Sequence, residues 1–134
     1  LLAELGMLDE LRTRIVEGMP VLGTCAGLIL LARDLPPTTI RGRRAWQPWM
    51  CSLSAMLTAD SSAAFAQGAG SGIDCEVPLT FIRAPRIVEV HGDTEALAEV
   101  DGRIVAARQG NQLGVTFHPE LDEDTRLHEL FLQM

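Results

Sequence analysis

Residues 20–32 decide the fold, and they read Pro20-Val21-Leu22-Gly23-Thr24-Cys25-Ala26-Gly27-Leu28-Ile29-Leu30-Leu31-Ala32. The run predicts a short apolar strand, a sharp turn with Cys25 at its tip, and a helix directly behind the turn. Gly23 and Gly27 stand two residues on either side of Cys25, which is the spacing of a nucleophile elbow. We expect glycine at both positions because larger residues would clash in so tight a turn. The helix N-terminus behind Cys25 would favour its thiolate.

A buried structural cysteine is the alternative reading of Cys25, and a second motif argues against it. A buried strand is predicted over residues 114–117, and it ends at His118. Glu120 lies two residues further, so both side chains point to the same side of an extended segment, and Pro119 restricts the backbone between them. Cys25, His118 and Glu120 therefore supply the nucleophile, the base and the orienting acid of a triad.

The elbow and the run Phe117-His118-Pro119-Glu120-Leu121 resemble the class I (triad) glutamine amidotransferases, most closely the glutaminase subunits of pyridoxal 5'-phosphate synthase. The resemblance covers roughly residues 1–34 and 80–134. It implies a glutaminase that hydrolyses L-glutamine to glutamate and ammonia and passes the ammonia to a synthase subunit in a hetero-oligomer. It also implies Cys25 as the nucleophile, with His118 and Glu120 completing the triad, and it implies no cofactor.

The resemblance also predicts how the substrate is bound. Ile82 and Arg83 match the glutamine-binding pair of the family. Arg83 has a physical reason of its own, because a guanidinium can hold a substrate carboxylate through two parallel hydrogen bonds. The backbone amide of Ala26 is expected to stabilise the oxyanion that forms during the reaction.

The chain is expected to form one incomplete amidotransferase domain over residues 1–134. Family members open with further strands and a glycine-rich loop that supplies another oxyanion amide, and the sequence has no counterpart of them. Residues 35–79 are atypical and include a run rich in Ser, Ala and Gly from Ser52 to Gly72, so we expect a loop or disorder there. All eleven basic residues are arginine, which fits a GC-rich gene and the hypothesis of a frameshift in this stretch. The alternative function is therefore a non-catalytic fragment that at most docks to a partner.

Composition argues against several other classes of protein. The net charge of −7 disfavours a general nucleic-acid binder. The three cysteines have neither zinc-ligand spacing nor the even count of a disulfide framework, so no metal site is expected. The longest apolar run is too short to cross a membrane. A reactive thiol suits the reducing cytoplasm.

The fold class expected is α/β: a partial doubly wound, flavodoxin-like three-layer sandwich with a mixed sheet that lacks its first strands. Asp101-Gly102 predicts a two-residue hairpin turn, and Pro85 is expected to separate two strands. The acidic run at 122–124 suits the start of the last helix, where the dipole favours negative charge. The expected elements are helices at 1–17, 26–33 and 125–134, and strands at 79–84, 86–90, 96–100, 103–108 and 112–117.

Overall fold

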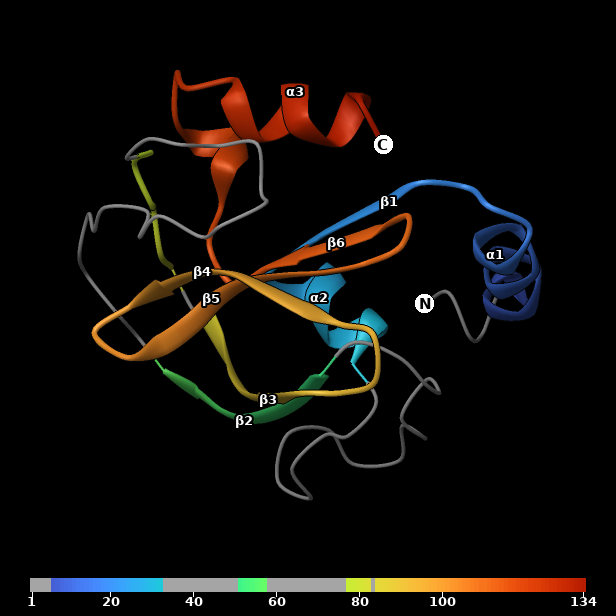
Figure 1. The fold of residues 1–134 in the computed structure, drawn as a ribbon, viewed down its shortest axis with the longest axis horizontal. Coiled ribbons are helices and arrows are strands. Elements are labelled where there is room, and N and C mark those ends of the chain that lie inside the picture. Colours follow the sequence, from blue (N-terminus) through green and yellow to red (C-terminus); the bar gives the residue numbers. More distant parts are fainter. Residues whose placement is uncertain (1–5, 33–50, 58–76, 83) are drawn as a thin grey trace.

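The computed structural model describes residues 6–32, 51–57, 77–82 and 84–134, with the backbone alone for 51–57 and Ala84. Figure 1 shows the arrangement of its helices and strands. In chain order they are α1 (Met7–Val16), β1 (Val21–Thr24), α2 (Ala26–Leu31), β2 (Cys51–Leu57), β3 (Ala84–Val90), β4 (Glu95–Val100), β5 (Arg103–Gln109), β6 (Gln112–Val115), the 3-10 turn η1 (Pro119–Leu121) and α3 (Arg126–Leu132).

The strands form one mixed sheet in the order β1-β6-β5-β3-β2, with β4 paired to β5. Only β1 and β6 are parallel among the described strands, and Thr24 lies opposite Val115 at the end of that pair. The carboxyl ends of parallel neighbours meet at one edge of a sheet. The turn after β1 and the segment after β6 therefore begin side by side at the same edge of the sheet.

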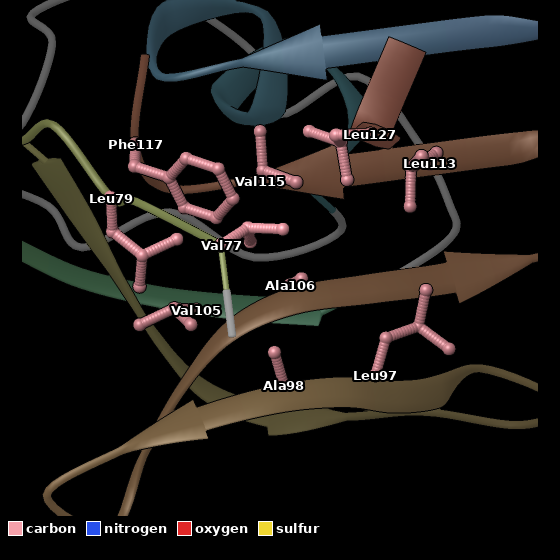
Figure 2. Packing of buried hydrophobic residues seen from close by; sticks show 10 residues of the cluster. All are labelled: Val77, Leu79, Leu97, Ala98, Val105, Ala106, Leu113, Val115, Phe117 and Leu127. Atoms are coloured by element: carbon pink, nitrogen blue, oxygen red, sulfur yellow. The ribbon is translucent and has the colours of Figure 1, made fainter. Parts of the chain in front are cut away.

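Helices cover both faces of this sheet, as the sequence predicts. Ala106 and Ala107 are neighbours on β5, and their side chains enter different cores because alternate strand residues face opposite ways. Figure 2 shows the first core, which includes Leu127 of α3. The second core joins α1, α2 and the sheet and contains Ile15, Leu28, Leu31, Ala32, Ile87 and Ala107. The three-layer α/β expectation is confirmed.

The predicted turn at Asp101-Gly102 is also confirmed, and a second turn, at Gly18, obeys the same rule. Asp101 and Gly102 connect β4 to β5 with φ of 51° and 70°, the paired positive values of a type I′ turn. Gly18 follows α1 with φ of 107°, and its N–H donates to the Ile15 carbonyl at 3.1 Å. Each turn uses a residue type that tolerates positive φ, so both could be predicted from sequence alone.

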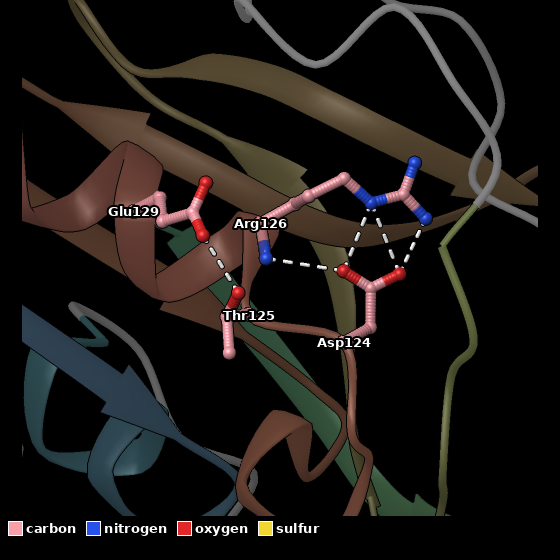
Figure 3. Close-up of polar contacts among 4 residues, drawn as sticks. All are labelled: Asp124, Thr125, Arg126 and Glu129. Atoms are coloured by element: carbon pink, nitrogen blue, oxygen red, sulfur yellow. Dashed lines mark hydrogen bonds and ion pairs between the residues drawn. The ribbon is translucent and has the colours of Figure 1, made fainter.

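Asp124, the last residue of the acidic run before α3, provides hydrogen-bond acceptors at the helix start (Figure 3). Asp124 Oδ1 accepts from the Arg126 backbone N–H at 3.0 Å and from Arg126 Nε at 2.9 Å. The guanidinium of Arg126 also pairs with the second oxygen of Asp124. These hydrogen bonds, together with the charge of Arg126, hold the pKa of the Asp124 carboxyl below its ordinary value, although partial burial acts against them.

The strand predictions around Pro85 need correction. Pro85 does not separate two strands but lies inside β3. The β2–β3 register is irregular between Ser54, opposite Arg86, and Leu57, opposite Ala84, so Pro85 falls where regular pairing lapses. Residues 77–81 form no strand. The expectation of loop or disorder over residues 35–79 is wrong at 51–57, which form the strand β2. Residues 33–50 and 58–76 lie outside the described part of the chain.

Candidate active site

Cys25 lies in a strained turn between β1 and α2. Its φ of 46° and ψ of −100° make it one of two non-glycine residues with positive φ in the described part of the chain. A strained backbone of this kind is what a nucleophile elbow requires. The Cys25 N–H donates to the Val115 carbonyl at 3.0 Å, which attaches the turn to the end of β6.

The two glycines beside Cys25 differ in their surroundings. A Cβ added at Gly23 would lie 2.7 Å from Leu31 Cδ1 and 2.9 Å from the backbone carbon of Gly27, so this position requires glycine. A Cβ added at Gly27 would meet no described atom within 4 Å. The expectation that a side chain would clash is therefore confirmed at Gly23 and wrong at Gly27. The backbone of Gly27 is instead one of the groups that a side chain at Gly23 would meet.

His118 and Glu120 form a close pair just after β6. His118 Nδ1 and Glu120 Oε1 are 2.7 Å apart, with 18% of the His118 side chain and 47% of the Glu120 side chain exposed. The predicted pairing is confirmed, but Glu120 lies in the 3-10 turn η1 and not in the extended segment on which the expectation rested. Because Nδ1 faces the carboxylate, Nε2 is the nitrogen left to exchange protons with another group.

The histidines near Glu120 lower the pKa of its carboxylate. Partial burial acts to raise the pKa of Glu120, but the hydrogen bond with His118 and the charges of His118 and His128 outweigh it, so the pKa lies below its ordinary value. The pair therefore keeps its carboxylate ionised and able to stabilise a charged imidazole.

The pKa of the Cys25 thiol is raised, which contradicts the expectation that the helix N-terminus would favour the thiolate. Burial is the largest cause, and the negative charge of Glu120 acts in the same direction. A hydrogen bond from the Ala26 backbone lowers the pKa but does not compensate. The Cys25 side chain is buried, and α2 has only six residues, so desolvation outweighs the helix dipole.

Of the remaining predicted site residues, Ala26 and Ile82 lie in the described part of the chain. Ala26 is exposed at the first position of α2. Ile82 is 56% exposed, and Arg83 lies outside the described residues. The structure thus joins His118 to Glu120 directly and brings the Glu120 charge to bear on Cys25.

Thr80, which is not among the site residues predicted from the sequence, contacts the candidate site. Its carbonyl accepts a hydrogen bond from the His118 N–H at 2.8 Å. Next to Thr80, Phe81 packs edge-to-face on Phe117, with ring centroids 6.1 Å apart. Thr80 belongs to no motif, and the contact joins segments distant in sequence, so no local signal could have revealed it.

The described residues offer neither a metal site nor a membrane span. They contain no group of three His, Cys, Asp or Glu side chains that could hold a metal ion. None of the helices in this part of the chain has the length and apolar character needed to cross a membrane.

Comparison with known proteins relates the whole chain to one family. The model of the SNO glutamine amidotransferase family matches residues 1–134, the stretch 35–79 included. A crystal structure of a glutamine amidotransferase superposes with a TM-score of 0.81 and 30% sequence identity, over 98% of this chain and 69% of that one.

Curated relatives carry the name pyridoxal 5'-phosphate synthase subunit PdxT. The protein of Methanocorpusculum labreanum is 46% identical over 142 residues, which cover all of this chain and 69% of the relative. That of Desulfitobacterium hafniense is 44% identical over 139 residues, covering 98% of this chain and 65% of the relative. The chain thus spans about two thirds of the length of these relatives.

Proposed function

Because the chain belongs to the SNO glutamine amidotransferase family, we propose that it hydrolyses L-glutamine to glutamate and ammonia and supplies the ammonia for pyridoxal 5'-phosphate synthesis. The observation that carries this proposal is the 2.7 Å pair of His118 and Glu120, beside the strained turn of Cys25. The sheet edge shared by β1 and β6 provides the common platform.

In the proposed reaction, the Cys25 sulfur attacks the side-chain amide carbon of glutamine. His118 takes the thiol proton and transfers it to the departing ammonia, leaving a thioester on Cys25. His118 then activates a water molecule, whose attack releases glutamate and restores the thiol. The Ala26 N–H, already directed at the sulfur, is suited to stabilise the oxyanion.

The raised pKa of Cys25 determines how this nucleophile would be activated. A thiol that burial and the Glu120 charge keep protonated needs a base beside it at neutral pH. His118 can act as this base when its ring is held in one orientation. The contact between His118 Nδ1 and the Glu120 carboxylate holds the ring in that way. The proposal therefore assigns proton transfer to His118 and orientation to Glu120.

Substrate binding is assigned from the resemblance and from position in the chain. Ile82 and Arg83 come shortly after Thr80 in the chain. The Thr80 carbonyl accepts a hydrogen bond from the backbone N–H of His118, whose imidazole is the proposed base. We assign Arg83 to the carboxylate of glutamine and Ile82 to the adjoining wall of the site.

The partner we propose is the synthase subunit of pyridoxal 5'-phosphate synthase, in a hetero-oligomer. Its support is the name shared by the curated relatives, which calls each of them a subunit of that enzyme. A free catalytic thiol is compatible with a reducing compartment, so we place the reaction in the cytoplasm.

The test is ammonia release from L-glutamine with and without the synthase subunit. We expect release that Cys25→Ala abolishes, because Cys25 stands at the elbow, and that the matched change Cys75→Ala leaves intact. Release that persists in Cys25→Ala would overturn the assigned nucleophile. A complete lack of Cys25-dependent ammonia under both conditions would support a non-catalytic, partner-docking fragment instead.

A further inference from the structure

The turn that carries the His118–Glu120 pair is closed by two backbone hydrogen bonds at the long end of the usual range. Within η1, Leu121 N–H donates to the His118 carbonyl at 3.2 Å, and Asp122 N–H donates to the Pro119 carbonyl at 3.3 Å. Such a single turn has little stability of its own. Its orientation against the sheet must therefore depend on contacts from elsewhere.

Thr80 contacts this turn at both of its ends. Its backbone carbonyl accepts from the His118 N–H at 2.8 Å, before the turn. Its hydroxyl donates to Asp122 Oδ1, also at 2.8 Å, after the turn. One residue thus holds the start and the end of the segment that carries both proposed catalytic side chains.

Thr80 is well suited to act as an anchor because its own segment is fixed. Leu79 is fully buried in the core beneath α3, and Phe81 packs on Phe117, the residue before His118. Asp122 is half-buried, and its second oxygen, Oδ2, is buried with no hydrogen-bond partner in the described part of the chain. A partly buried carboxylate with one hydrogen bond from a side chain depends strongly on that bond.

We propose that Thr80 and Asp122 are positioning residues, whose hydrogen bond holds the His118–Glu120 turn in its productive orientation. The assignment rests on the proposed glutaminase function. The same bond joins the catalytic turn to the segment that leads into Ile82, so it also sets the spacing between proposed base and proposed substrate wall. Misplacement of a catalytic group by about 1 Å can lower a rate on the order of a hundredfold.

The experiment uses the chain with the synthase subunit and compares substitutions at Thr80 and Asp122 with a control. Thr80→Val removes the hydroxyl and keeps the shape of the side chain, whereas Thr80→Ser keeps a hydroxyl. Asp122→Ala removes the acceptor of the hydrogen bond, whereas Asp122→Asn retains an acceptor oxygen. Thr94→Val is the matched control, because the Thr94 hydroxyl donates to Gln109 Oε1 at 3.1 Å, in the region of β4 and β5.

We expect Thr80→Val and Asp122→Ala each to lower kcat on the order of tenfold or more, while Thr80→Ser, Asp122→Asn and Thr94→Val stay near the starting value. The double variant that combines Thr80→Val with Asp122→Ala should be no worse than either single one. The downfield proton resonance of the His118–Glu120 hydrogen bond, identified by its loss in Glu120→Gln, should broaden in Thr80→Val and return in Thr80→Ser.

An unchanged kcat and an unchanged resonance in Thr80→Val would overturn the proposal. If Thr80→Val does not fold, the contrast between Asp122→Ala and Asp122→Asn decides in its place. If the parent chain releases no Cys25-dependent ammonia, the proposed function fails, and the resonance alone then shows whether Thr80 holds the pair.

Discussion

The backbone N–H of Cys25 donates to the carbonyl of Val115 at 3.0 Å, across the end of the only parallel strand pair in the described sheet. This bond places the strained cysteine turn beside the segment that continues into His118. Two motifs from opposite parts of the chain thus meet because β1 and β6 pair in register.

The elbow glycines should respond differently to the same substitution. Gly23→Ala puts a Cβ 2.7 Å from Leu31 Cδ1 and 2.9 Å from backbone, and such overpacking costs about 1–3 kcal/mol of unfolding free energy. Gly27→Ala meets no described atom and replaces a helical glycine, so it should be neutral or stabilising by up to about 1 kcal/mol. Urea denaturation of both variants tests this, and equal losses would contradict the crowding argument.

The reactivity of Cys25 should depend on pH and on Glu120. Since burial and the Glu120 charge raise the pKa of this thiol, alkylation by iodoacetamide should rise only at pH values above the ordinary thiol range, about 8.5. Glu120→Gln removes one raising cause, so its alkylation profile should move to lower pH. Mass spectrometry of the Cys25 peptide measures both profiles, and a shift to higher pH would refute the assigned electrostatics.

Asp124 should stabilise the start of α3 in a pH-dependent way. Its pKa is lowered in the folded chain, so its contribution is present above the ordinary aspartate pKa, about 3.9, and disappears as pH falls through the folded value. Asp124→Asn should therefore cost up to about 1 kcal/mol at pH 7 and little at low pH.

The exposed neighbour Glu123 provides the matched control, because Glu123→Gln removes the same charge one residue away. The melting temperatures of the two variants, measured across the pH range, should differ near neutral pH and become equal in acid. Parallel curves at every pH would show that the Arg126 pairing adds nothing.

Asn111 should secure the end of α1 to the β5–β6 hairpin. Its side-chain amide donates to the carbonyls of Ile15 at 3.1 Å and Met19 at 2.6 Å. Asn111→Asp replaces this donor with an acceptor and should cost about 1–3 kcal/mol. Thr13→Ala, which removes an exposed hydrogen bond within α1, should change stability little. Hydrogen exchange that stays equally slow in α1 of both variants would contradict the tether.

The candidate site could be predicted from sequence to the extent that its parts are local. The elbow at Cys25 and the pairing of His118 with Glu120 follow from spacing within a few residues, and both appear in the structure. The direction of the Cys25 pKa could not be predicted, because it depends on burial and on the distant charge of Glu120.

The sequence by itself determined the elements whose conformation is set by near neighbours. The type I′ turn at Asp101-Gly102, the end of α1 at Gly18 and the apolar face of α3 are of this kind, since backbone sterics and helical periodicity act over a few residues. Tertiary structure alone decided the strand β2, the place of Pro85 within β3 and the contact of Thr80 with Asp122. Each of these depends on a partner segment brought close by folding, and no stretch of sequence read in isolation contains that partner.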